Sequence, residues 1–171
     1  ARVAPMMADY YETRRRKEPQ AGKFQSASAY IAAPFEIMHV VYESADGERP
    51  LELALVRDAD GTYKLDWESY TGSGQMAWDV LQKERPTTPV LMRAYAVQDE
   101  HFNFEFNDAT RFLCLKLVSK DFAHELYAYT EKGSDLAAEI EANAPTGSLH
   151  PLTVRIAYPP NAQSGNCVRL E

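Results

Sequence analysis

The residues best suited to acid–base or metal chemistry are four histidines and the carboxylates near them. His124 and Glu125 are neighbours, so on a strand their side chains face opposite ways. His101 and Glu105 lie four residues apart in an alternating stretch and do not converge unless a bulge intervenes. His39 falls in another alternating stretch, with no nucleophile or acid at useful spacing. We therefore expect neither catalytic residues nor a metal site, and we expect a protein that is not an enzyme.

Three other motifs with chemical potential are incomplete. Asp58-x-Asp60-Gly61 matches the start of a calcium loop, but the remaining ligands and the distal Glu are missing. Gly72-Ser73-Gly74 does not have the spacing of a GxSxG nucleophile elbow. The two cysteines, Cys114 and Cys167, form no CxxC motif and are expected to be buried free thiols, unless the fold brings their Cα atoms within about 7 Å. No cofactor is expected.

Aromatic and cationic side chains alternate with leucines in the C-terminal half, a pattern suited to ligand binding. If Leu113, Leu115 and Leu117 point inward, the residues between them point outward, where rings and cations can stack on sugars or bases. The candidate ligand-binding residues are Arg93, Tyr95, Phe112, Lys116, Tyr127 and Tyr129. The alternative is that these tyrosines cover a second core, against the N-terminal half or a partner subunit.

The elements that must position these side chains follow one another from residue 89 to residue 171. Period-two alternation predicts strands, and a helical pattern between Ser134 as N-cap and Ala144 predicts one helix. The predicted strands cover 90–97, 112–118, 124–130, 152–158 and 167–170, and His101–Phe106 also alternates, with three phenylalanines on one side.

Three strands, a helix and two strands is the element order of the OB-fold, which this half of the chain resembles. The resemblance implies a five-stranded Greek-key barrel that binds oligonucleotides or oligosaccharides on its second and third strands. A mixed antiparallel sheet backed by a helix is the alternative architecture.

The N-terminal half predicts a helix over Val3–Lys17 followed by a three-stranded antiparallel meander. Its strands are expected within 31–42, 51–56 and 63–67, with Asp60-Gly61 as a hairpin turn. The hairpin from Leu51 to Trp67, with its Tyr63-Lys64-Leu65-Asp66-Trp67 strand, resembles the closing hairpin of nuclear-transport-factor-2-like domains. The predicted organisation is α+β: an N-terminal part (1–72), a linking helix (73–88) and an OB-like barrel (89–171).

Charge is the strongest constraint on partners. The 171 residues carry a formal charge of −7. Residues 1–86 hold 11 basic and 14 acidic residues and residues 87–171 hold 7 and 11, so neither half is basic. Because nucleic-acid binding relies on neutralised phosphates, this balance argues against DNA or RNA.

The leading expectation is a non-enzymatic binding or assembly module, the soluble part of a bacterial envelope protein. Its partners would be another protein, a second copy or an oligosaccharide. A single-stranded nucleic-acid-binding OB protein and a small cone-fold enzyme with a pocket in the N-terminal half are the alternatives. The sequence starts with Ala inside an apparent helix, so we expect a preceding signal or anchor, the only expected link to a membrane, and a periplasmic or cell-surface location, with the cytoplasm as alternative.

Overall fold

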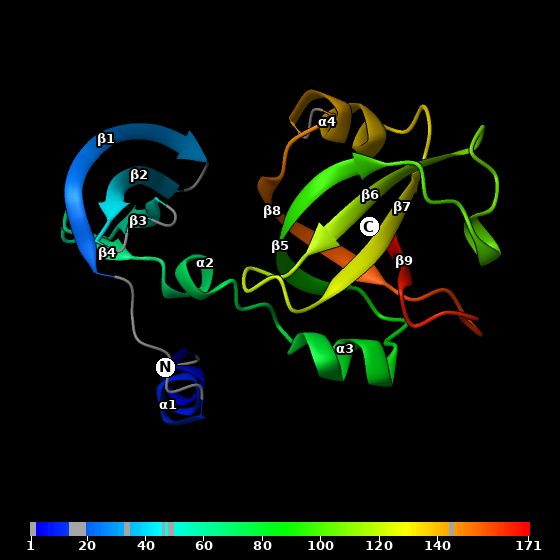
Figure 1. Cartoon of the computed structure of the whole chain (residues 1–171), viewed down its shortest axis with the longest axis horizontal. Coiled ribbons are helices and arrows are strands. Elements are labelled where there is room, and N and C mark those ends of the chain that lie inside the picture. The colour runs from blue at the N-terminus through cyan, green and yellow to red at the C-terminus, as the bar shows by residue number, and fades with distance from the viewer. Residues whose placement is uncertain (1–2, 14–19, 33–34, 46, 48–49, 144–145) are drawn as a thin grey trace. The chain divides into compact units, whose positions relative to one another are not determined.

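The computed structural model describes all residues except 1–2, 14–19, 33–34, 46, 48–49 and 144–145, and Figure 1 traces its elements. The chain divides into two compact units, Ala1–Thr71 and Gly72–Glu171. The first combines helices with an antiparallel sheet and the second is a closed barrel with helices. The predicted α+β class is therefore confirmed.

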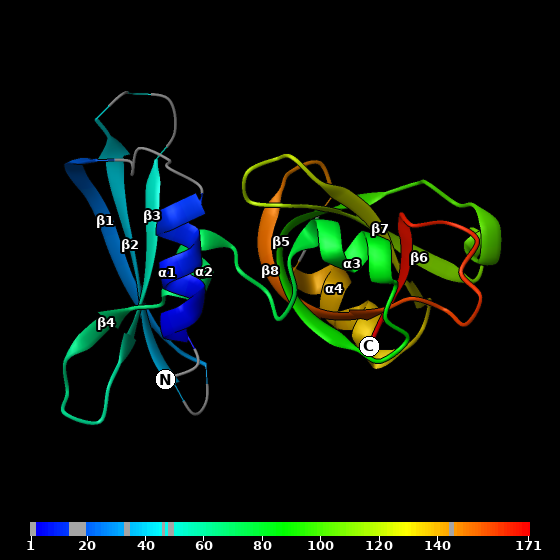
Figure 2. The ribbon, with the colours of Figure 1, turned by 90° about the horizontal axis from the view of Figure 1, so that it is seen from below.

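The first unit is a four-stranded antiparallel sheet with two helices. Its elements are α1 (Val3–Thr13), β1 (Ala21–Ala32), β2 (Phe35–Ser44), β3 (Leu51–Arg57), β4 (Tyr63–Leu65) and α2 (Trp67–Thr71). The strands lie in chain order, so β1 and β4 form the two edges (Figure 2).

Strand β1 was not predicted, and the meander has four strands rather than three. Its central Ser26-Ala27-Ser28-Ala29 run alternates only between small side chains, without large apolar residues, so the sequence signal for a strand is weak. Trp67 was expected to end the last strand but begins α2. The predicted helical residues 14–17 lie outside the described residues.

The β3–β4 hairpin confirms the turn predicted at Asp60-Gly61. Asp58 N donates to Thr62 O over 2.8 Å and Gly61 N donates to Asp58 O over 2.9 Å. Gly61 has a φ of +84°, which favours glycine. Asp60 Oδ1 accepts a bond from Thr62 N, and Asp58 pairs with Lys64. Both carboxylates therefore stabilise the turn itself.

The first unit has a small core. Of its described residues, only Val40 and Trp67 are buried, and Tyr10 of α1 packs edge-on against Trp67 with ring centroids 5.5 Å apart. Every residue of β1 from Ala21 to Ala29 is exposed. Strand β1 is therefore held mainly by its ladder to β2.

The second unit is a closed five-stranded barrel. Its elements are α3 (Trp78–Glu84), β5 (Val90–Asp99), the 3-10 turn η1 (Phe104–Phe106), β6 (Phe112–Val118), β7 (Glu125–Glu131), α4 (Asp135–Asn143), β8 (His150–Ala157) and β9 (Cys167–Leu170). The strand order is β5-β6-β7-β9-β8, closed by β5–β8 pairing. Only the β7–β9 pair is parallel among these ladders.

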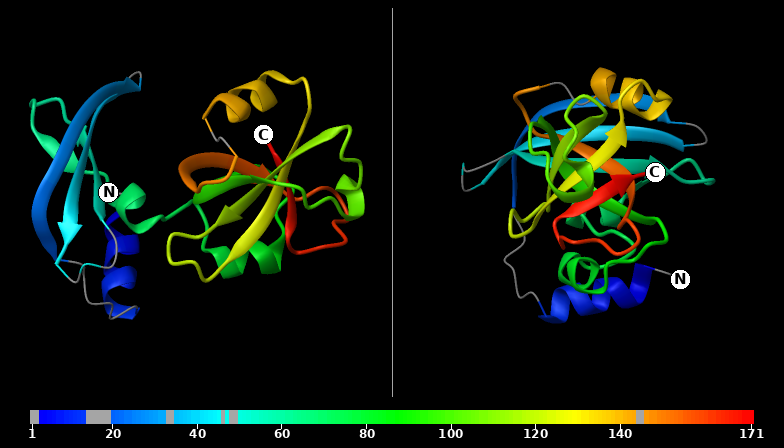
Figure 3. Two further views of the ribbon diagram at one scale, coloured as in Figure 1. Left: turned by 45° about the horizontal axis from the view of Figure 1, so that its top comes forward. Right: turned by 90° about the vertical axis from the view of Figure 1, so that its right-hand side faces the viewer.

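The inward side chains of the barrel form one apolar core. As predicted, Leu113, Leu115 and Leu117 lie in it, and Leu81 of α3 and Ile140 of α4 also pack against it. Helices α3 and α4 lie at opposite ends of the barrel (Figure 1 and Figure 3). The alternation read from the sequence therefore identifies the interior correctly.

The two helix starts differ in how well the sequence predicts them. Ser134 caps α4 as expected, because its Oγ accepts a 3.1 Å bond from Ala137 N. Helix α3 begins only at Trp78, inside the predicted linking helix 73–88, and its N-cap residue Ala77 makes no side-chain cap bond.

Candidate ligand-binding face

The six candidate residues all lie at outward positions of the barrel, on β5, β6 and β7. Lys116 of β6 pairs with Val97 of β5 on one side and with Tyr127 of β7 on the other. Tyr127 in turn pairs with Cys167 of β9. Inward leucines on the same strands fix this orientation. The candidates nevertheless fall into three different environments.

One part of this face is partly accessible, and we call it the open surface: Tyr95, His101, Lys116, Phe122 and Tyr127. Tyr95 stacks on Phe122 with ring centroids 5.8 Å apart, and Tyr127 stacks on His101 at 3.8 Å. Phe122, in the β6–β7 hairpin, is 45% exposed and has a φ of +61°. Two aromatic pairs thus belong to strands on either side of Lys116.

The charge on the open surface is locally balanced. Lys116 Nζ lies 2.7 Å from Glu125 Oε2, and this hydrogen bond raises the pKa of Lys116. Burial raises the pKa of Tyr127, so its hydroxyl stays protonated at neutral pH. The surface therefore offers ring faces and hydroxyl groups, with its cation already paired.

Arg93 does not join this surface. Its Nη1 donates to Ser73 O over 2.8 Å, and the side chain is half-buried. The guanidinium of Arg93 therefore holds the segment that leads into α3. The alternation of residues 92–96 indicates only that Arg93 points outward and does not predict this contact.

Phe112 and Tyr129 were expected to be exposed, and that expectation is wrong. They are 9% and 0% exposed, within what we call the covered cluster: Phe106, Phe112, Cys114, Tyr129 and Cys167. Phe102 and Tyr127 pack against it. The cause is the connection between β5 and β6, residues 100–111, which we call the cover segment. The alternative, that these side chains belong to a second core, therefore applies to Phe112 and Tyr129. Their cover comes from the cover segment of the same unit, not from the N-terminal half or a partner subunit.

Sequence reasoning missed the cover segment because His101–Phe106 alternates as a strand would. In the structure Phe104–Phe106 is a 3-10 turn, and Phe104 has a φ of +52°. Phe106 stacks on Tyr129 with centroids 4.2 Å apart and planes 7° apart. Tyr129 Oη donates to His101 O over 2.7 Å. The alternating phenylalanines thus serve a compact loop.

The two cysteines are free and buried, as predicted. They lie on β6 and β9, which β7 separates. Two strand spacings put their Cα atoms about 10 Å apart, beyond disulfide reach. Burial raises the pKa of Cys114 to about 12 and also raises those of Cys167 and Tyr129. Both thiols are therefore protonated and inert under the cover.

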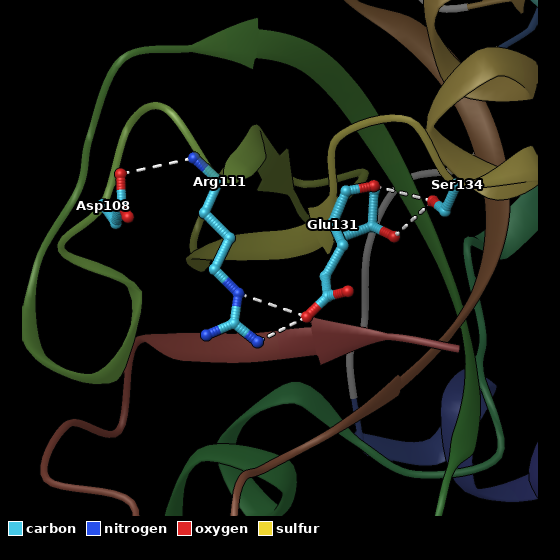
Figure 4. Close-up of polar contacts among 5 residues, drawn as sticks. Asp108, Arg111, Glu131 and Ser134 are labelled. Carbon is cyan, nitrogen blue, oxygen red and sulfur yellow. Dashed lines mark hydrogen bonds and ion pairs between the residues drawn. The ribbon is translucent and has the colours of Figure 1, made fainter.

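A bidentate ion pair ties the C-terminal end of the cover segment to the barrel (Figure 4). Arg111 donates from Nε and Nη2 to Glu131 Oε1 over 3.2 and 2.5 Å, and the backbone carbonyl of Glu131 accepts a 2.7 Å bond from Ser134 Oγ. Asp108 Oδ1 accepts a bond from Arg111 N. Glu131 thus links the cover segment to the start of α4.

The middle of the cover segment is held by one carboxylate that is only partly satisfied. Glu105 Oε1 accepts a 2.7 Å bond from Gln163 N in the β8–β9 connection. Its Oε2 is buried and has no hydrogen-bond partner among the residues that the structure describes. Nearby Glu105 contributes to the raised pKa of Cys167.

The histidines are dispersed. His39 lies 3.5 Å from Glu52, and both side chains are exposed, at 37% and 48%. His124 lies 3.3 Å from Gln82 and stacks on Trp78. Within the described part of the chain, no group of three or more His, Cys, Asp or Glu side chains is arranged to hold a metal ion.

Phe122, His101 and Glu125 shape the open surface but were not predicted. Phe122 follows the Ser119–Asp121 turn, and an aromatic residue at a hairpin tip was the available signal. His101 and Glu125 reach the surface through loop geometry and cross-strand pairing, which a single sequence does not reveal.

None of the described helices is long and apolar enough to cross a membrane. No protein-family model matches the chain, and neither a curated protein nor a solved structure matches it. The assignment of function therefore depends on the barrel topology and on the open surface.

Proposed function

We propose that this protein is a non-enzymatic binding or assembly module, in which an OB-type barrel binds an oligosaccharide at the open surface. The observation behind the proposal is the pair of aromatic stacks, Tyr95–Phe122 and Tyr127–His101, on strands flanking Lys116. OB barrels bind oligonucleotides and oligosaccharides on their second and third strands, which correspond here to β6 and β7.

The barrel topology supports the OB interpretation. The element order is three strands, a helix and two strands, and β5 pairs with both β6 and β8. Strand β9 lies between β7 and β8, parallel to the former and antiparallel to the latter. This arrangement fits a five-stranded Greek-key barrel.

The charge balance favours a neutral ligand. Lys116 is paired with Glu125, so binding a phosphate there would break an ion pair. The chain as a whole is acidic, which disfavours a polyanion. Flat apolar faces of sugar rings can stack on tyrosine and phenylalanine without a counter-charge.

Isothermal titration calorimetry with chitohexaose and with cellohexaose tests the proposal. We expect binding that Tyr95→Ala weakens by about 5- to 150-fold, since one ring stack is worth about 1–3 kcal/mol. Tyr11→Ala is the matched control, because Tyr11 is an exposed tyrosine of the first unit. No heat with either sugar at millimolar concentration would contradict the oligosaccharide proposal. Salt-dependent binding of single-stranded DNA would favour the nucleic-acid alternative.

Strand β1 favours a second role in self-association. It is a twelve-residue edge strand, and its residues from Ala21 to Ala29 are exposed on both faces. Long unprotected edges are templates for pairing with another chain, and Lys23 is the only charge in β1. Light scattering over a concentration series tests this role.

Two further alternatives have weaker support. A cone-fold enzyme would need an enclosed acid–base pair, whereas His39 and Glu52 are both exposed. The periplasmic or cell-surface location stays a prediction, and fractionation of cells that express the tagged protein tests it.

A further inference from the structure

We infer that the cover segment is displaceable and that the Phe106 ring occupies a second, closed subsite for a ligand's ring next to the open surface. The inference rests on the proposed function, but the cover can be tested without any ligand. Three properties of residues 100–111 support it.

The first property is what the cover hides. Tyr127 and Tyr129 are two residues apart on the outward side of β7, about 7 Å from each other. Tyr127 carries the His101 ring and Tyr129 carries the Phe106 ring, both nearly parallel. Moving residues 102–106 away would expose the Tyr129 ring face next to the Tyr127–His101 stack of the open surface.

The second property is how the cover is attached. Phe106 N bonds to Asn103 O inside the segment itself. Its backbone bonds to the barrel lie at its C-terminal end, from Phe112 N to Asp108 O and from Lys132 N to Arg111 O. Its other ties use side chains, among them Tyr129 Oη to His101 O and Lys132 Nζ to Ala109 O, each at 2.7 Å. The Arg111–Glu131 pair at its end is exposed, with both side chains 61% accessible. Such contacts can break without opening a strand ladder of the barrel.

The third property is the Glu105 carboxylate. In the closed state one of its oxygens is buried and accepts no hydrogen bond from the described part of the chain. A buried acceptor without a partner loses its hydration energy. Displacement of the cover returns this oxygen to water and so favours opening.

Labelling of the native thiols measures the opening directly, because Cys114 and Cys167 both lie in the covered cluster. We would label the full chain with iodoacetamide over a urea series. Trp78 fluorescence in a Trp67→Phe background reports barrel unfolding in parallel, because Trp78 packs in the barrel core. We expect labelling at least about 100-fold faster than unfolding predicts, with little urea dependence below the transition. Labelling that matches barrel unfolding in rate and urea dependence would overturn the inference. This test needs no substitution in the cover segment.

Phe106→Ala tests the ring itself. Loss of a buried phenylalanine corresponds to about a 10²–10³-fold change in an equilibrium constant. We expect labelling to accelerate by that factor and to stay at least about 100-fold faster than the variant's own unfolding predicts. The urea midpoint falls as well, because the closed native state loses the Phe106 contacts relative to both the open and the unfolded state. Phe104→Ala is the matched control, because Phe104 is in the same segment but 47% exposed, and it should change labelling less than about twofold. Labelling of Phe106→Ala that matches the rate and urea dependence of its own barrel unfolding would make the segment an inseparable part of the barrel core.

Ligand binding distinguishes the subsite from mere mobility. If the closed state competes with the ligand, Phe106→Ala should tighten chitohexaose binding, because a larger fraction of the protein is competent. Faster labelling with unchanged affinity would refute the subsite. Absence of chitohexaose binding in both proteins would contradict the proposed function and leave the labelling result intact.

Discussion

Gly74 should be intolerant of any side chain, although nothing about its backbone angle requires glycine. It is buried where the chain enters the barrel unit, and its φ lies outside the left-handed range. A Cβ there would lie 2.7 Å from Met92 Sδ and 2.8 Å from Leu91 O. The second contact is with backbone of β5, which is fixed by its ladders to β6 and β8.

The expected magnitude follows from two opposing effects. Replacing glycine by alanine where φ permits stabilises a protein by about 0.4–1 kcal/mol through the unfolded state. Overpacking costs about 1–3 kcal/mol, and a contact with backbone should lie near the upper end. We therefore expect Gly74→Ala to destabilise the barrel by about 2 kcal/mol, or roughly 8–16 °C in Tm for a unit of this size.

Differential scanning calorimetry of the full chain measures the effect. Gly133→Ala is the control, because Gly133 has a φ of +79° and no atom within 4 Å of an added Cβ. It should cost about 1–2 kcal/mol from backbone strain alone. An unchanged or raised Tm for Gly74→Ala would refute the steric reasoning and show that β5 moves freely at Leu91.

Three further outcomes follow from the structure. Ser134→Ala should destabilise the barrel by about 1 kcal/mol, measured as a lower Tm, because Ala137 N loses its cap, and an unchanged Tm would count against that cap. Barrel stability should fall as pH rises above 9, because the folded state holds the thiol proton of Cys114 more tightly than the unfolded chain does. This one group should account for a loss of about 1.4 kcal/mol per pH unit up to about pH 12. Urea midpoints at pH 8 and 10.5 measure that loss, which should be smaller in Cys114→Ala, and equal losses in both proteins would contradict the assigned cause. Ala27→Lys should abolish concentration-dependent light scattering by placing a charge on the exposed edge strand, whereas Ala142→Lys on α4 should not, and equal association of all three proteins would exclude β1 pairing.

The barrel was predictable because its strands alternate strongly. Leu113, Leu115 and Leu117 mark the interior of β6, and the change of period after Ser134 marks α4. The Asp60-Gly61 turn was equally clear, since few residue pairs suit a tight hairpin. In each case local side-chain preference and the final fold agree.

The failures share one physical cause, which is dependence on distant parts of the chain. Strand β1 has small polar residues and is a strand mainly because β2 pairs with it. Phe112 and Tyr129 point outward as predicted, yet Phe106 covers them from a loop with strand-like alternation. The exposure of Phe112 and Tyr129 therefore depends on the β5–β6 connection, whose alternating residues wrongly indicate a strand.

Strand β9 completes the barrel, since it is the only strand that joins β7 to β8 in the described sheet. During synthesis on a ribosome, β7 and β8 are made before Cys167–Leu170 and have no neighbour on their facing edges until those four residues emerge. Folding of this unit must therefore wait for its last strand. A nascent chain stalled at Asn166 would expose the unpaired edges of β7 and β8 and become a substrate for chaperones or proteases.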